Sequence, residues 1–251
     1  MFYTVSMKKI LFISLSTLFL IVIFGCAGTG GQISEDKLIE AEVQPEPETE
    51  AETPPEESAE KTETAPSVPP DAYTAITQKC MDGDDIDFNK LRLAYAESEY
   101  YSPYGAVVSG QIDELISSGS FEDACYLVSD NIYNYLGDLE FLYYAFIAFN
   151  KIGDENAGFF QYVFWGIIES IDNSGDGLSY ETAFHVVSVR EEYIYMSMHD
   201  IIHGGQSLQD DSGHLYDVFE VMPNPEAEVE FAGENIYFNI DLVMGYLSDL
   251  F

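Results

Sequence analysis

The feature that most constrains this chain is an abrupt change of composition at about residue 70. Residues 28–70 contain no aromatic residue and seven of the ten prolines, and most of the rest is glutamate, threonine, alanine and serine. Such a segment cannot bury enough apolar surface to offset the entropy lost on folding, and its charges repel one another. We therefore expect residues 26–70 to form a disordered, extended tether, which confines a single compact domain to residues 71–251.

The chain begins with the features of a bacterial export signal. Met7, Lys8 and Lys9 are a more usual start than the six residues before them, so Met7 is the expected true start. The apolar run over residues 10–24 suits a signal peptide and is shorter than the about 20 residues of a membrane-spanning helix. Residues 1–25 are therefore predicted to be a cleaved signal peptide.

The signal ends in Ile23, Phe24, Gly25 and Cys26, which resembles the lipobox of bacterial lipoproteins. The aliphatic residue, the small residue and the thiol stand in the expected order, although Phe24 is bulkier than usual. The alternative is an ordinary signal in which the cysteine stands by chance. We predict lipidation at Cys26, with the lipid bilayer as partner. Ala27, in place of an inner-membrane retention aspartate, favours the outer membrane of the cell envelope.

The chain is strongly acidic, with 45 Asp and Glu residues against 9 Lys and Arg residues and a net charge of −36. Nucleic acids require clustered basic side chains, so they are excluded as partners, and anionic lipid headgroups are equally poor ones. A metal cation or a basic protein stays open as a partner, and the alternative is that the charge serves solubility alone.

Two cysteines besides Cys26 lie in the domain, Cys80 and Cys125. An exported protein can form a disulfide between them. Cys125 belongs to an apolar series, so a buried free thiol is the alternative. Two cysteines cannot provide a four-thiolate zinc site.

The first part of the domain, about residues 87–172, is predicted to be helical. Polar or glycine-containing turns separate five segments with apolar residues at helical spacing, namely residues 87–95, 107–116, 121–136, 139–151 and 155–171. Turns this short imply antiparallel neighbours. Residues 138–171 resemble one tetratricopeptide repeat, because the small residues Ala145 and Ala157 have the separation found in that repeat.

Fewer than three such units rarely stand alone, so these helices need a second layer. Three short runs rich in β-branched and aromatic residues supply it, at residues 183–189, 215–221 and 236–240. We predict an α+β fold. The antiparallel helical hairpins pack with a small antiparallel sheet that takes up most of residues 173–251, and a helix over residues 241–250 closes the domain.

One pattern resembles a calcium loop incompletely. Asp172, Ser174 and Asp176 take the first, third and fifth positions of an EF-hand loop, and Gly177 takes the sixth. Ala183 stands where the loop needs a bidentate glutamate. The alternative is a glycine-rich helix end, and we predict no calcium.

A second pattern resembles a zinc motif. His199 and His203 stand four apart, which on a helix would place both imidazoles on one face. Asp200 replaces the catalytic glutamate of that motif with a shorter carboxylate, and Gly204 and Gly205 would end the helix at once. Partly exposed polar histidines are the alternative, so no metal and no cofactor are predicted.

No catalytic residue is predicted, because nucleophile elbows, phosphate-binding glycine loops and dinucleotide fingerprints are absent from the sequence. The aromatic residues between 141 and 165 would suit a sugar-stacking groove, but their helical spacing is more typical of a core. If a glycan site exists, its candidates are Asp176, Glu181 and His185, because paired carboxylates carry out glycan hydrolysis.

Several short strings follow the pattern of one known family. They lie at residues 91–95, 101–104, 174–177, 181–186, 192–193, 205–208 and 216–217. Together they resemble the DUF4919 family of secreted proteins and lipoproteins of Bacteroidetes, over a range from about Asp87 to the C-terminus. Tyr180 replaces the usual proline of that pattern. The resemblance implies that the protein is secreted, and it indicates where the domain begins and ends. It implies no activity, because the function of the family is unknown.

These observations favour a non-enzymatic envelope lipoprotein whose domain serves protein interaction or scaffolding. The alternative is an accessory lipoprotein that binds or processes glycans. A concave cleft with tyrosines beside Asp176, Glu181 and His185 would favour the glycan hypothesis, and a filled core would favour the interaction hypothesis.

Overall fold

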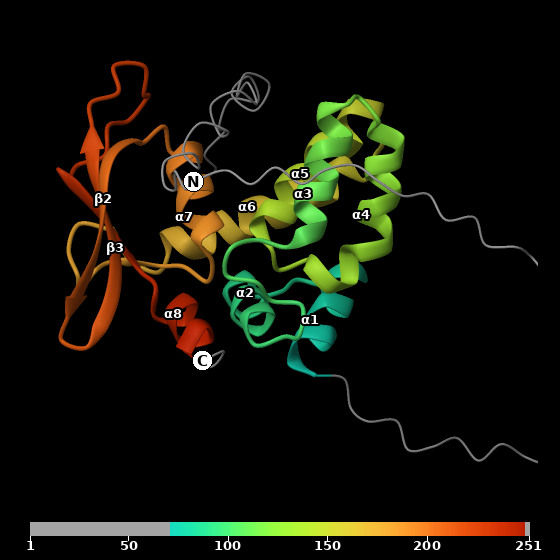
Figure 1. The fold of residues 1–251 in the computed structure, drawn as a ribbon. Helices are drawn as coiled ribbons and strands as arrows, with labels where there is room; N and C mark the ends of the chain where they lie inside the picture. The colour runs from blue at the N-terminus through green and yellow to red at the C-terminus, as the bar shows by residue number, and fades with distance from the viewer. Residues whose placement is uncertain (1–70, 249–251) are drawn as a thin grey trace, which may run out of the picture. The chain divides into compact units, whose positions relative to one another are not determined.

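A computed structural model describes residues 71–248 (Figure 1). The predicted signal peptide, Cys26 and the tether lie outside this range. None of the helices within it is long and apolar enough to cross a membrane. The elements confirm the predicted α+β class, and they follow in the order α1 (Ala72–Met81), α2 (Phe88–Ala96), α3 (Val107–Ser117), α4 (Phe121–Tyr135), α5 (Leu139–Ile152), α6 (Ala157–Asp172), β1 (Phe184–His185), α7 (Val189–Met198), β2 (Ile202–Asp211), β3 (His214–Met222), β4 (Asn235–Asn239) and α8 (Asp241–Ser248).

The five predicted helices correspond to α2–α6, and local signals set their ends. The Asp87 side chain accepts a hydrogen bond from the N–H of Lys90 at the start of α2. Asp138 caps α5 in the same way by accepting from the N–H of Phe141. Gly153 ends α5 with a φ of +71°. These caps satisfy backbone groups that the helix itself leaves unpaired.

Helix α5 is the centre of the helical half, where it contacts α3, α4, α6 and α7. The aromatic side chains of α5 and α6 mostly point inward. The buried ones are Phe141, Tyr144, Phe149, Phe160 and Phe164. These side chains therefore fill a core, as their helical spacing indicates.

The sheet has the strand order β1-β4-β3-β2. Strands β2 and β3 form an antiparallel hairpin that turns at Ser212 and Gly213, which have φ values of +56° and +86°. Strand β4 is antiparallel to β3, but β1 runs parallel to β4. The sheet is thus mixed, and the predicted purely antiparallel sheet was wrong in this respect. Strand β1 reaches β4 only after α7 and the hairpin intervene, so no tight turn forces the two strands to be antiparallel.

The predicted strand over residues 183–189 forms only at Phe184–His185. Ser188 ends it by capping α7, because its side chain accepts a hydrogen bond from the N–H of Glu191. Helix α7 contacts both α5 and β2, and it lies between the helical half and the sheet (Figure 1). Helix α7 therefore occupies sequence that was predicted to be mostly sheet.

A buried ion pair joins α2 to α7. Arg92 Nη1 lies 3.1 Å from Glu191 Oε2, and the two side chains are 1% and 0% exposed. Arg92 Nη1 also donates to the carbonyl oxygen of His185 at 2.7 Å. Glu191 Oε2 accepts from the N–H of Val187 at 2.8 Å. These bonds connect the helical half to the segment that leads from β1 into α7.

Cys80 and Cys125 are both free thiols, and both are buried. Of the two alternatives left open by the sequence, the structure therefore has the buried thiol and not the disulfide. Burial raises the pKa of each thiol to about 11. Neither cysteine forms an appreciable amount of the reactive thiolate at neutral pH.

Candidate functional site

The three predicted polar-site residues do not form one site. Asp176 and Glu181 lie in the connection between α6 and β1, His185 ends β1, and all three are exposed. Within residues 71–248 no hydrogen bond or ion pair joins any two of them. Hydrogen bonds from Thr182 and Ser179 lower the pKa values of Asp176 and Glu181, respectively. Both carboxyls are therefore ionised at neutral pH, which does not suit the general acid of a glycosidase.

Packing explains the Gly-Asp-Gly turn that contains Asp176. The N–H groups of Asp176 and Gly177 both donate to the carbonyl oxygen of Thr182, at 3.0 and 2.8 Å. A Cβ atom at Gly175 would lie 2.2 Å from that oxygen, and one at Gly177 would lie 2.3 Å from the Phe184 ring. The glycines therefore permit two close approaches of the backbone.

The calcium candidates have separate partners. Asp172 accepts a hydrogen bond from the Tyr195 hydroxyl at 2.6 Å. The Ser174 hydroxyl donates to the carbonyl oxygen of Ile171 and accepts from the N–H of His185. In the part of the chain that the structure describes, no three His, Cys, Asp or Glu side chains are placed to hold a metal ion. The turn therefore matches the alternative, a glycine-rich helix end.

His199 and His203 do not share a helix, so the geometry that a zinc pair at this spacing would require is not present. Helix α7 ends before His199, Asp200 reverses the chain with a φ of +57°, and His203 lies in β2. His199 Nε2 lies 3.3 Å from Asp172 Oδ1 and links α7 to the end of α6. The His203 ring packs against aromatic rings of α7 and β3. Both imidazoles thus have structural contacts.

Two buried carboxyl groups meet between α7 and β3, and the sequence did not indicate them. Glu192 is 0% exposed and Asp217 is 8% exposed. The Glu192 carboxyl group has no partner except the carboxyl group of Asp217, which also accepts from Gln206 Nε2 at 2.9 Å. Burial raises the pKa of Glu192 well above its ordinary value, and the neighbouring Asp217 raises it further. We infer that this pair keeps at least one proton at neutral pH.

Another buried carboxyl group, that of Glu140 in α5, has a partly exposed partner. Arg190 Nε lies 3.3 Å from Glu140 Oε1 and donates to the carbonyl oxygen of Tyr104 at 3.3 Å. Burial raises the pKa of Glu140 to about 7, although Arg190 lowers it. A Cβ atom at Gly105 would lie 2.5 Å from Glu140 Oε2, so the loop before α3 needs glycine there.

His214 and Asp241 form an exposed pair where β3 begins and α8 begins. His214 Nδ1 lies 2.6 Å from Asp241 Oδ2, and Asp241 also accepts from the N–H of Leu215 at 2.8 Å. A carboxylate that orients an imidazole in this way is one part of a general-base site. No serine, threonine or cysteine of residues 71–248 hydrogen-bonds to His214, so the nucleophile of an acyl-transfer site is missing there.

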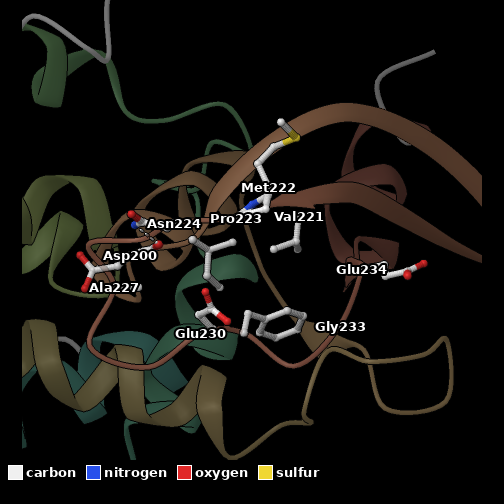
Figure 2. A pocket seen from close by; sticks show the side chains of 11 residues that line it. Asp200, Val221, Met222, Pro223, Asn224, Ala227, Glu230, Gly233 and Glu234 are labelled. Atoms are coloured by element: carbon white, nitrogen blue, oxygen red, sulfur yellow. Dashed lines mark hydrogen bonds between the residues drawn. The ribbon is translucent and has the colours of Figure 1, made fainter.

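A hollow of ≈ 200 Å³ lies where β3 ends and β2 begins (Figure 2). Three carboxylate residues belong to its lining, namely Asp200, Glu230 and Glu234. Apolar side chains form much of the rest, with Ile201, Val221, Met222, Pro223 and Phe231. The lining comes from three separate segments of the chain, which is why no local sequence pattern predicted it.

Strand β2 is an edge strand, because the sheet order ends with it. The hydrogen bonds of β3 show which backbone N–H and C=O groups of β2 point toward β3 and which point outward. The N–H of Val221 bonds to the carbonyl oxygen of Glu234, and the carbonyl oxygen of Leu215 accepts from the N–H of Ile240. Odd-numbered residues of β3 therefore bond toward β4, and even-numbered ones bond toward β2, since these directions alternate along a strand.

The register then shows which backbone groups of β2 face outward. Beyond the bulge at residues 203–206, the β2 residues that pair with the even-numbered residues of β3 are Ser207, Gln209 and Asp211. Their neighbours Leu208 and Asp210 direct their N–H and C=O groups to the open side. Within residues 71–248 these outward groups have no backbone partner. Leu208 is also 58% exposed, so the open edge carries an apolar side chain.

Comparison with known proteins agrees with the strings found in the sequence. A family model described as a domain of unknown function, DUF4919, matches residues 83–247. This range includes the sheet, α7 and every residue that lines the hollow. Comparison with curated proteins and with solved structures found no match. The family match covers well over half of the chain, and the protein therefore belongs to the DUF4919 family.

Proposed function

We propose that this protein is a lipid-anchored lipoprotein of the cell envelope whose folded domain binds a partner protein. In this proposal the signal over residues 1–25 exports the chain, Cys26 carries the acyl anchor, and residues 26–70 hold the domain away from the outer membrane. The basic start, the short apolar run and the lipobox-like end support the anchor.

The observation that carries the interaction hypothesis is the open edge of β2. An unpaired strand edge presents a row of donors and acceptors to which another chain adds as a further strand. Natural proteins usually shorten, charge or cover such edges. Here the edge strand runs over Ile202–Asp211, and the outward-facing Leu208 position has an exposed apolar side chain.

The partner in this proposal is an extended segment of another protein. A second copy of the chain is a poor candidate, because its net charge of −36 would oppose self-association. The glycan alternative has less support. The Tyr180 ring packs against the rings of Tyr216 and Tyr237, with ring centroids 5.0 Å apart in both cases. The three rings therefore contact one another. They do not line a cleft beside Glu181 and His185.

The anchor is tested by expressing the full chain in a Gram-negative bacterium that is fed an alkyne-labelled fatty acid. We expect the label on the protein and its complete loss in Cys26→Ala. Cys80→Ala is the matched control, because it removes a buried thiol of the domain and should keep the label. Label that persists in Cys26→Ala would contradict the anchor.

The edge is tested with a photo-crosslinking amino acid in place of Asp210, in cells that make the protein naturally. We expect a discrete cross-linked product that disappears when Leu208→Pro is added, because proline removes an outward N–H and leaves the β2–β3 bonds intact. Leu208→Ala is the control for the side chain and should keep the product. The proposal fails if Leu208→Pro folds normally and the product persists.

A further inference from the structure

The hollow beside β2 is held open by its own loop. Residues 223–234 connect β3 to β4, and the N–H of Val221 closes the neck of this loop by donating to the carbonyl oxygen of Glu234 at 2.8 Å. Asn224 Nδ2 ties the loop to the turn after α7 by donating to the carbonyl oxygen of Asp200 at 2.7 Å. Compact loops closed at the neck in this way often carry binding functions.

Apolar side chains give the hollow a surface that a hydrocarbon group would cover. Ile201, Val221 and Phe231 are partly exposed there. The volume of ≈ 200 Å³ is below the about 300–1,000 Å³ of sites for drug-sized ligands. The occupant is therefore a short group, of the size of one extended side chain.

The charge of the hollow selects a cation. Residues 223–234 contain four glutamates and no lysine or arginine, and no basic residue belongs to the lining. Glu230 stands among the lining side chains, with Val221 across from it, whereas the side chains of Met222 and Glu234 point away from it (Figure 2). An anion would be repelled, and a cation would gain the attraction of this negative charge.

A bare metal ion does not fit the same residues. Metal ions such as calcium require several oxygen ligands at one point. The carboxylates of the hollow are spread around an apolar surface, and no metal-holding group of side chains occurs in residues 71–248. The arrangement suits a cation that has a hydrocarbon part.

We propose that this hollow binds a primary alkylammonium group, with the hydrocarbon against Ile201, Val221 and Phe231 and the ammonium beside Glu230. The group is carried either by a lysine side chain or by a small free amine, and both share the chemistry that the hollow recognises. This proposal concerns a different surface from the open edge of β2 and stands independently of strand pairing there.

The test is a titration of the full chain, labelled with ¹³C at the isoleucine δ1 methyl groups, with pentylammonium. Ile201 lines the hollow and reports occupancy, and its resonance is assigned with Ile201→Val. We expect a saturable shift with pentylammonium, a weaker one with 1-pentanol and none with pentanoate. The proposal is overturned if the Ile201 methyl does not respond to the amine, or if it responds equally to the alcohol.

Two variants separate recognition from the general attraction of an acidic chain for cations. Glu230→Gln should weaken pentylammonium binding about fivefold, the effect expected for a partly exposed ion pair. Glu234→Gln removes the same charge from the same lining, but its carboxylate points outward, so affinity should change less than about twofold. Equal losses in the two variants would overturn the assignment of Glu230.

A final pair of titrations identifies the source of the ammonium. Nα-acetyl-lysine N-methylamide represents a lysine side chain within a protein, and cadaverine represents a free amine. A tighter response to the lysine derivative assigns the hollow to a protein partner, and a tighter response to cadaverine assigns it to a small molecule. Absence of both responses would overturn the proposal.

Discussion

Glu192 is the residue whose chemistry depends most on its burial. Its carboxyl group has no cation beside it in residues 71–248, and its one polar neighbour is the carboxyl group of Asp217. Because its pKa rises on folding, Glu192 makes its full contribution to stability at pH values below its ordinary pKa of 4.5. That contribution is lost as the pH rises through the raised pKa, because the ionised form is poorly solvated inside the protein.

Glu192→Gln should therefore make stability less sensitive to high pH. We expect the free energy of unfolding of the variant, relative to that of the parent, to rise by at least about 1 kcal/mol between about pH 5 and about pH 9. Urea unfolding over this pH range measures it. Glu220→Gln removes an exposed carboxyl from the same strand as Asp217 and should show no comparable trend. A parallel pH dependence in Glu192→Gln and the parent would contradict the argument.

Glu140 allows a direct measurement of a carboxyl pKa. Burial raises its pKa to about 7, and Arg190 opposes that rise. Arg190→Met should raise the pKa of Glu140 above 7, which a carboxyl ¹³C titration detects. Lys151→Met is the control, because it removes a charge from the opposite end of α5 and should leave the titration unchanged. A lower pKa in Arg190→Met would show that the ion pair does not stabilise the carboxylate.

At the scale of the elements, α2–α6 were predictable because their apolar residues recur at helical spacing between clear caps and turns. Helix α7 was not, because Glu191 and Glu192 face the core and break the usual pattern of polar residues outside. Strand β2 was missed since it contains Gly204 and Gly205 and is mostly exposed, so it lacks alternation. In both elements, contacts with distant residues decide the local structure.

The Arg92–Glu191 pair makes α7 depend on α2. Arg92→Met should lower the free energy of unfolding by about 3–5 kcal/mol, because it leaves the Glu191 charge buried without a partner. Arg92→Met combined with Glu191→Leu should cost clearly less than the sum of the two single changes. Urea denaturation of the four proteins completes this cycle. Additive losses would show that the two side chains act separately.

At the scale of the whole molecule, the sequence predicted the α+β class and the family, and it did not predict the hollow or the open strand edge. Class and family follow from patterns within short segments. The hollow combines the turn after α7, the end of β3 and the loop 223–234. The edge depends on the order of strands in the sheet. The spacing of neighbouring residues predicts neither arrangement.

The acidic balance of the chain should make its stability depend on salt. Like charges repel more strongly in the compact state, and salt screens them. We expect the unfolding temperature to rise by about 2–4 °C from about 0.02 M to about 0.5 M sodium chloride, which corresponds to about 1 kcal/mol. Differential scanning calorimetry measures it. Tetramethylammonium chloride should give the same rise, whereas a rise with sodium alone would indicate a bound ion.

The buried Arg92–Glu191 pair also has a consequence for folding during synthesis, when N-terminal residues are available before C-terminal ones. The two residues are 99 positions apart, and α3–α6 lie between them. A polypeptide that emerges N-terminus first, from a ribosome or from a translocation pore, therefore presents six helices before the carboxylate that neutralises Arg92 exists. Until then, closing α2 onto the core would bury an unpaired guanidinium. The pair can therefore form only after nearly the whole domain has been synthesised.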